Sequence, residues 1–222
     1  MTQAHLLNEV QVANAFAAPA NTAANDIMAR MGVRMTFAKD EEIYGQDEEA
    51  DFIYRVVSGA VRTSRLMSDG RRQIGGFYYA EETFGVETNG LHRFSAEALS
   101  DCVVLVLKAS ALRSAVGEDA FQRLVWAETN RELSRTQDHL LLLGRKTASE
   151  KVASFLMELA DRRSAEAVTL PMGRQDMADY LGLTIETVSR MLTQLQSALV
   201  VEFTGARRFR VNNRGALARM AA

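Results

Sequence analysis

The sequence predicts an α+β protein with three consecutive parts: an antiparallel β-barrel, one long helix, and a small helical region that ends in a β-hairpin. Three observations support this fold class. Short segments rich in β-branched and aromatic residues recur between residues 33 and 107. From about residue 110 the apolar residues instead recur every three or four positions. A strand-like pattern returns after residue 200, around Gly205.

The barrel is expected to contain strands at residues 33–37, 52–57, 60–66, 73–79, 94–99 and 102–107. Polar turns such as 39–42 separate them, and Asp69-Gly70 is typical of a tight hairpin. Many short strands at this spacing favour an antiparallel barrel or sandwich over a βαβ fold. Residues 1–25, rich in Ala, Asn and Gln, are expected to form a flexible tail with a short helix at most.

Helical periodicity begins with a short helix at 110–116, which should end at Gly117. A long helix is expected at 118–145. One face of this helix carries a stripe of near-heptad spacing, formed by Trp126, Leu133, Leu140 and Leu143. Such a stripe suits the contact between two helices of a dimer. The alternative is a helix that packs on its own barrel. A further helix is expected at 147–162, with an apolar face of Val152, Phe155, Leu156 and Leu159.

Two short helices with a tight turn between them are expected at residues 174–181 and 185–197. Gly182 supplies the positive φ that the turn needs, and Thr184 is a competent N-cap for the second helix. Met177, Ala178 and Leu181 should face inward from the first helix, and Val188, Leu192 and Leu195 from the second. This arrangement is typical of a helix-turn-helix.

The opposite face of the second helix carries polar side chains in its first two turns, where a recognition helix reads base edges. Glu186 can accept from a cytosine amino group, and Arg190 can donate two bonds to guanine. We therefore expect base contacts from Glu186, Ser189 and Arg190, while Ile185, in the first turn, could also face outward. A surface ion pair between Glu186 and Arg190, spaced i, i+4, is the alternative interpretation.

A β-hairpin follows directly, with strands at 200–204 and 207–211 around Gly205-Ala206. Its far strand carries Arg207, Arg208 and Arg210, as expected of a wing that contacts phosphates. Residues 169–172 could add a third short strand. The region is thus predicted to be a winged helix-turn-helix that binds double-stranded DNA, with phosphate contacts from Arg174, Thr184, Thr187, Arg207 and Arg208.

The charge distribution agrees with this division, although the whole chain has a net charge of −2. Residues 145–222 carry 12 Lys and Arg against 8 Asp and Glu, a net charge of +4, and residues 1–144 carry 14 against 20, a net charge of −6. An acidic region joined to a basic one fits a sensor attached to a nucleic-acid reader. The domain boundaries expected are 1–25 for the tail, 26–117 for the barrel, 118–145 for the dimerisation helix and 146–222 for the DNA-binding domain.

Several function classes lack support in the sequence. Cys102 is the single cysteine, so it is interpreted as a small buried residue, and an internal disulfide is excluded. The three histidines have no metal-site spacing, and no hydrolase, P-loop or HExxH motif points to an enzyme. No apolar run approaches the ~20 residues that span a bilayer, and no secretory signal is recognisable. We expect a cytoplasmic protein without metal or cofactor.

With these parts in order, the chain resembles the CRP/FNR family of bacterial transcription regulators over nearly its whole length. The most specific matches are LPMGRQDMADYLGLTIETVSRML and TQDHLLLLGRKTASEKVASFLMEL. The resemblance implies a jelly-roll barrel of the cyclic-nucleotide-binding type. It also implies that Glu186, Ser189 and Arg190 match the FNR-type Glu-x-x-Ser-Arg reader. A homodimer would then bind a TTGAT-like inverted repeat and act through RNA polymerase.

The sensor motifs of the family are missing. Val86 follows Gly85 where a nucleotide-binding Glu belongs, and Phe94 precedes Ser95 where a phosphate-binding Arg belongs. The N-terminal cysteines of the iron–sulfur type are absent. His92 is interpreted as an exposed loop histidine rather than a haem ligand. The resemblance is therefore to the FixK-like branch, whose members activate genes of microoxic respiration and nitrogen fixation. The alternative is a regulator gated by a small molecule or a haem-bound gas in the barrel.

Overall fold

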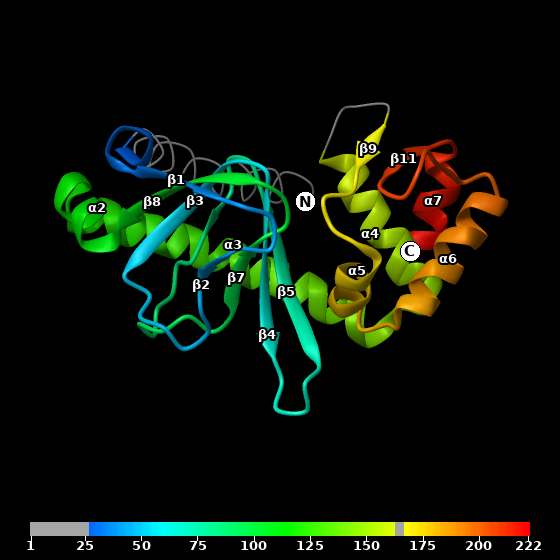
Figure 1. Ribbon diagram of the computed structural model, residues 1–222, viewed down its shortest axis with the longest axis horizontal. Coiled ribbons are helices and arrows are strands. Elements are labelled where there is room, and N and C mark those ends of the chain that lie inside the picture. Colours follow the sequence, from blue (N-terminus) through cyan, green and yellow to red (C-terminus); the bar gives the residue numbers. More distant parts are fainter. Residues whose placement is uncertain (1–26, 163–166) are drawn as a thin grey trace, which may run out of the picture. The chain divides into compact units, whose positions relative to one another are not determined.

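The computed structural model describes residues 27–162 and 167–222, so the expected N-terminal tail lies outside the described residues. The strands are β1 Val33–Phe37, β2 Glu42–Tyr44, β3 Phe52–Ser58, β4 Ala60–Leu66, β5 Arg72–Tyr79, β6 Thr83–Phe84, β7 Ser95–Ala98, β8 Cys102–Lys108, β9 Val168–Thr169, β10 Val201–Phe203 and β11 Arg208–Val211. The helices are α2 Ala109–Val116, α3 Glu118–Arg145, α4 Ala148–Asp161, α5 Arg174–Leu181, α6 Ile185–Ser197 and α7 Arg214–Ala221 (Figure 1).

The antiparallel strands and the long helix confirm the predicted fold class. Of the described residues, 27–61 together with Phe77–Ser134 form one compact unit, and those of Arg62–Gly76 and Arg135–Ala222 form a second. The first unit contains most of the strands, and the second contains α4 to α7 with the hairpin between β4 and β5. Each unit is described by itself below.

Two sheets of four strands carry the N-terminal part, in the orders β1-β8-β3-β6 and β2-β7-β4-β5. Each predicted strand is present, with bounds shifted by no more than one residue. Sequence analysis missed β2 and β6, which have three and two residues, and wrongly placed Glu42 in a turn. Such short strands show no measurable alternation, because their pairing with a neighbour defines them.

An aromatic cluster fills the core between these sheets. Tyr44, Tyr54 and Phe84 are almost fully buried, and the ring centroids of Tyr44 and Tyr54 lie 5.0 Å apart. Cys102 is 1% exposed in the same core, as predicted. Burial, with smaller effects of Glu41 and Asp101, raises the pKa of the Cys102 thiol to about 11, so the thiol is protonated and unreactive at neutral pH.

The prediction that His92 is an exposed loop histidine is wrong. His92 is 1% exposed, and its ring stacks on Tyr44 at 3.6 Å between centroids. Its backbone N–H donates to the Glu48 carbonyl, and its carbonyl accepts from Asp47, so the loop is paired like a strand. Alternation then turns Leu91 outward and His92 inward. Burial lowers the pKa of His92, although Glu48 opposes the shift.

The predicted helices are also present, and one more was missed. Thr147 is the N-cap of α4, and a capping box joins it to Glu150, whose backbone N–H donates to the Thr147 hydroxyl at 3.4 Å. The predicted apolar face of α4 is buried, at Val152, Phe155, Leu156 and Leu159. Sequence analysis missed α7, which Asn213 caps through the Ala216 N–H and which buries Leu217.

Candidate nucleic-acid interface

The helix-turn-helix consists of α5, a turn at Gly182 and α6. Met177, Ala178 and Leu181 of α5 and Val188, Leu192 and Leu195 of α6 are at most 3% exposed, so the predicted inward faces are correct. Gly182 is left-handed, with φ 60°, and a Cβ there would lie 3.3 Å from Leu143. The positive φ therefore favours glycine, and a side chain at this position would also require Leu143 to shift slightly.

Three side chains that sequence analysis did not assign hold the ends of α5. At its start, the Gly173 N–H donates to Asp176 Oδ2 at 3.1 Å. At its end, Lys151 Nζ donates to the Leu181 carbonyl at 3.1 Å, and the His139 ring contacts the Tyr180 carbonyl at 2.7 Å. Lys151 is 8% exposed. The sequence offered one signal for the Lys151 contact, since Lys151 directly precedes Val152 of the predicted apolar face. A lysine at the edge of such a face is partly buried, and its ammonium group then needs hydrogen-bond acceptors.

His139 also stacks on Tyr180, with the two ring planes 9° apart and the centroids 4.1 Å apart. Burial is the main cause that lowers the pKa of His139, and the nearby Lys151 charge adds to it. The Tyr180 carbonyl and Glu158 act in the opposite direction. The neutral imidazole is thus favoured, with Nε2–H directed at the carbonyl of α5.

The reading face of α6, defined as Ile185, Glu186, Ser189 and Arg190, lies in the first two turns. Thr184 caps the helix, since its hydroxyl accepts from the Thr187 N–H at 3.3 Å. Ile185 is 38% exposed and faces outward from the buried stripe. Arg174 Nη1 donates to Ser189 Oγ at 3.2 Å, so the start of α5 and the reading face are joined.

Glu186 and Arg190 do not form the surface ion pair that the alternative interpretation required. The pKa of Glu186 is lowered first by a hydrogen bond from its own backbone N–H and second by Thr184, so the carboxylate is turned toward the start of α6. Arg190 is exposed, and the part of the chain that the structure describes offers it no hydrogen-bond partner. Its guanidinium is available to an external acceptor.

The wing is present as predicted, with β10 and β11 paired through Phe203 and Phe209 and with β9 added as a third strand. β9 spans Val168–Thr169 and shares only Thr169 with the predicted segment 169–172, so the prediction placed this strand too far along the chain. Arg210 is engaged by Glu202 at 2.7 Å and by Asn212 at 3.1 Å. Arg207 and Arg208 are exposed on the same hairpin. Arg207 and Arg208 are therefore the wing arginines that stay candidates for the predicted phosphate contacts.

The stripe on α3 is exposed, with Trp126 at 70%, Leu133 at 52% and Leu140 at 68%, and Leu143 is half-buried. A different face of the helix packs on the first unit through Phe121 and Leu124, which are at most 6% exposed. The stripe is therefore not the face by which α3 contacts its own strands. It stays available for a second helix.

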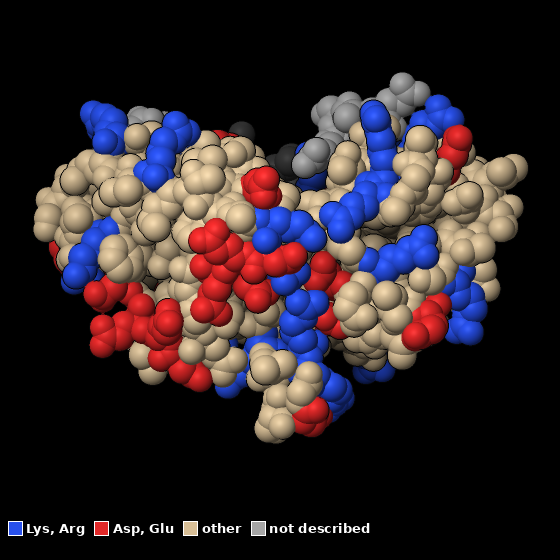
Figure 2. Space-filling view, in the orientation of Figure 1, with Lys and Arg blue, Asp and Glu red and all other residues tan. Residues whose placement is uncertain are grey.

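Surface charge follows the sequence division in part. In Figure 2, Asp and Glu side chains gather over the sheet-bearing part, where some Lys and Arg side chains also lie. Lys and Arg side chains lie over the winged-helix region and also over the β4–β5 hairpin, which belongs to the acidic residues 1–144. Within the described residues, no group of His, Cys, Asp or Glu is placed to hold a metal ion. None of the described helices is long and apolar enough to cross a bilayer.

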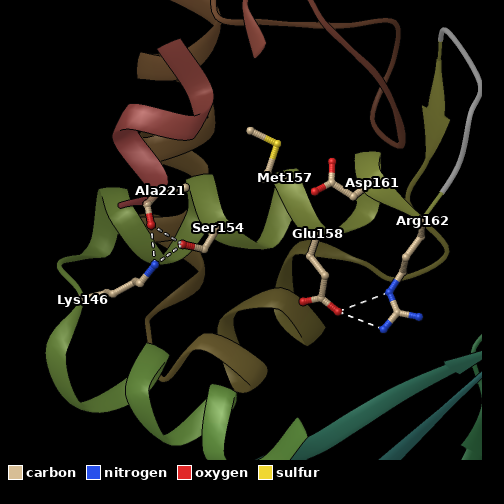
Figure 3. Close-up of a pocket in the computed structure, with 7 residues that line it drawn as sticks. All are labelled: Lys146, Ser154, Met157, Glu158, Asp161, Arg162 and Ala221. Carbon is tan, nitrogen blue, oxygen red and sulfur yellow. Dashed lines mark hydrogen bonds and ion pairs between the residues drawn. The ribbon is translucent and has the colours of Figure 1, made fainter. Parts of the chain in front are cut away.

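A surface pocket of about 570 Å³ lies where α7 meets α4, away from the reading face. Figure 3 shows the Lys146 ammonium directed at Ser154 and the Ala221 carbonyl, and Glu158 directed at Arg162. The Lys146–Ser154 hydrogen bond is 2.9 Å long, and the shorter of the Glu158–Arg162 bonds is 3.0 Å. These polar groups form hydrogen bonds with one another, and the contacts of Lys146 and Ser154 hold the C-terminal end of α7 on α4.

Comparison with protein families defines the class. Residues 150–220 match the Crp-like helix-turn-helix domain, and residues 34–119 match the cyclic nucleotide-binding domain. The first match covers α4 to α7 with the reading face and the wing. This combination defines a DNA-binding transcription regulator.

Proteins of similar sequence and structure identify the branch of the family to which the chain belongs. The chain is 45% identical to the nitrogen fixation regulation protein FixK of Azorhizobium caulinodans, over 95% of this chain and 88% of that protein. It is 42% identical to FixK of Rhizobium meliloti, over 78% and 79%. The structure of FixK2 from Bradyrhizobium japonicum matches with a TM-score of 0.83 and 48% identity, over 86% and 98%. The chain belongs to the CRP/FNR family of transcription regulators, in its FixK branch.

Proposed function

We propose that this FixK-type regulator binds a TTGAT-like inverted repeat as a homodimer, without a small-molecule ligand, and that it is not an enzyme. Its functional parts are the barrel at 26–117, the dimerisation helix at 118–145 and the DNA-binding domain at 146–222. It acts in the cytoplasm, through RNA polymerase, on genes of microoxic respiration or nitrogen fixation. The printed role of the FixK relatives supports the last point.

The observation that carries the proposal is the reading face. Arg190 is exposed and has no partner in the described chain, and Ser189 is fixed beside Arg174. An arginine so placed can make the bidentate contact to guanine that specific readers use most often. Glu186 and Ile185 suit a cytosine amino group and a thymine methyl group. Arg174, Thr184, Thr187, Arg207 and Arg208 supply the phosphate contacts.

The exposed stripe of α3 supports a homodimer with two-fold symmetry. Leu133, Leu140 and Trp126 would be covered by the same residues of a second copy, with Leu143 at the end of the stripe. Two-fold symmetry places the recognition helices about one turn of DNA apart, ~34 Å, and explains why the site should be an inverted repeat.

The residues at the nucleotide-motif positions support regulation without a cyclic nucleotide. Val86 and Phe94 stand where the family motif places its nucleotide-binding Glu and Arg. A carboxylate and a guanidinium for ribose and phosphate are thus missing from these two positions.

Fluorescence anisotropy with purified protein tests the proposal. The duplexes are a TTGAT-type palindrome, the same duplex with one half-site scrambled, and one with its half-sites moved apart by about 5 bp, half a turn. We expect tight binding to the first and at least ~100-fold weaker binding to the other two. Equal affinity for the three duplexes, or binding that needs added cyclic AMP or haem, contradicts the proposal.

A further inference from the structure

The β4–β5 hairpin, residues Arg62–Gly76, packs in the same compact unit as the winged helix. Two of its arginines do not project into solvent. Arg62 on β4 is 8% exposed, and the Arg72 side chain at the start of β5 is 27% exposed. Burying two guanidinium groups is unfavourable unless each is paired, so their partners indicate what the hairpin does.

Both arginines contact α5. Arg62 Nη1 donates to Asp176 Oδ1 at 3.1 Å, and Arg72 Nη2 donates to the same oxygen at 2.7 Å. Arg72 Nε also donates to Asp179 Oδ2 at 2.8 Å. Asp176 and Asp179 lie one turn apart on one face of α5, so the planar fork of Arg72 bridges both carboxylates.

Asp176 connects this cluster to the start of α5. Its Oδ1 accepts from the two arginines, and its Oδ2 accepts from the Gly173 N–H that begins the helix. The next residue, Arg174, donates to Ser189 of the reading face at 3.2 Å. Hydrogen bonds, together with the peptide bond between Gly173 and Arg174, therefore connect the hairpin to the reading face.

The cluster also has an electrostatic consequence. Asp176 and Asp179 place two negative charges on a helix of a motif that must approach phosphates. Arg62 and Arg72 neutralise them within the described structure, and hydrogen bonds to Asp179 and Asp176 raise the pKa of Arg72 despite the opposing effect of burial. Within the described structure, removing Arg72 leaves Asp179 without its ion-pair partner and leaves Asp176 with Arg62 alone, so the geometry of α5 and the local charge both change.

We propose that Arg62 and Arg72 of the β4–β5 hairpin are positioning residues for DNA recognition, which act through Asp176 and Asp179 by fixing the start of α5 and neutralising its carboxylates. The hairpin then contributes to DNA recognition by the winged helix-turn-helix, although β4 and β5 belong to a sheet of the barrel. The inference rests on the DNA binding proposed above.

The test compares Arg72→Gln with Arg71→Gln. Both remove one positive charge from the same hairpin, but Arg71 is 82% exposed at the tip and pairs there with Asp69. We expect Arg72→Gln to weaken binding to the palindrome by about tenfold, which is ~1.4 kcal/mol, and Arg71→Gln to change it by less than about twofold. Hydrogen exchange at residues 173–181 should become faster in Arg72→Gln alone.

A double-mutant cycle separates positioning from a loss of fold. Asp179→Asn is measured alone and with Arg72→Gln, at a temperature where circular dichroism shows each variant to be folded. We expect the double variant to lose no more affinity than Arg72→Gln alone, because the two residues act as one unit. Losses that add, or an Arg72→Gln variant that binds like Arg71→Gln, overturn the inference. If the wild-type protein binds no palindrome, the proposed function fails first.

Discussion

At the scale of single residues, the proposed DNA contacts divide into base readers on the reading face and phosphate contacts outside it, and we expect the two roles to respond differently to truncation. Arg190→Ala should cost ~1–3 kcal/mol on the palindrome and relax the preference at one base pair, because a bidentate contact to guanine is lost. Affinities for a set of duplexes, each with one substituted base pair, measure this. An unchanged base preference would show that Arg190 does not read guanine.

Arg208 serves as the comparison for a phosphate contact, because it is also exposed but lies on the wing. Arg208→Ala should weaken binding to the palindrome and to scrambled DNA by the same factor. It should also lower the slope of log K against log salt by about 1. Titrations at several salt concentrations test both points. A loss confined to the palindrome would instead make Arg208 a base reader.

His139 should make stability depend on pH. Burial lowers its pKa in the folded protein, so the unfolded chain binds its proton more tightly. The stabilisation is then complete above the ordinary histidine pKa of about 6.5 and is lost as the pH falls below it. We expect the free energy of unfolding to decrease from pH 7 to pH 5, and less steeply in His139→Gln.

Chemical denaturation at several pH values measures that slope. His92, whose pKa burial also lowers, contributes to the slope that remains in His139→Gln. The same slope in both proteins would mean that His139 is not buried as the neutral form.

The residues of the reading face could be predicted because helical spacing separates the buried stripe from the exposed face. The contacts of His139, Lys151 and Asp176 could not, because their partners are backbone atoms or side chains far away in the sequence. His92 was mispredicted for a related reason. Because histidine is polar, the sequence favours an exposed loop position for it. Backbone hydrogen bonds with residues 47 and 48 instead turn the His92 ring inward.

At the scale of elements, the long helix α3 carries two exposed leucines in adjacent positions. Leu140 belongs to the stripe and is 68% exposed, and Leu141 lies beside the stripe and is 61% exposed. Leu140→Glu should shift the protein to monomers and greatly weaken palindrome binding, because it places two carboxylates in the predicted seam. Leu141→Glu is the control, since it adds the same charge outside the seam.

Analytical ultracentrifugation of the two variants measures the oligomeric state. Equal monomer fractions in Leu140→Glu and Leu141→Glu would place the dimer contact elsewhere.

Elements of regular length were predictable, with bounds within a residue or two. Caps and glycines gave the clearest limits: Gly117 ends α2 with φ 82°, and Thr184 begins α6. The elements that were missed are β2, β6 and α7. The two strands are too short to show a period, and α7 has a single buried residue, Leu217, so its apolar face is too narrow to recognise.

At the scale of the whole molecule, an acidic chain can bind DNA because its charge is unevenly distributed. The basic region from residue 145 contains the reading face and the wing, and the acidic region contains the barrel. The order of barrel, long helix and winged helix was predictable from periodicity. The assignment of the β4–β5 hairpin to the unit of the winged helix was not, because it depends on ion pairs between residues about 100 positions apart.

The central claim is that the protein recognises a TTGAT-like inverted repeat as a dimer without a ligand. Footprinting of the purified protein on a DNA fragment that carries this palindrome, with nothing added, tests it most directly. We expect protection of both half-sites at the same protein concentration, and no change when cyclic AMP is added. Protection of neither half-site, or protection that appears only with cyclic AMP or haem, would contradict the account.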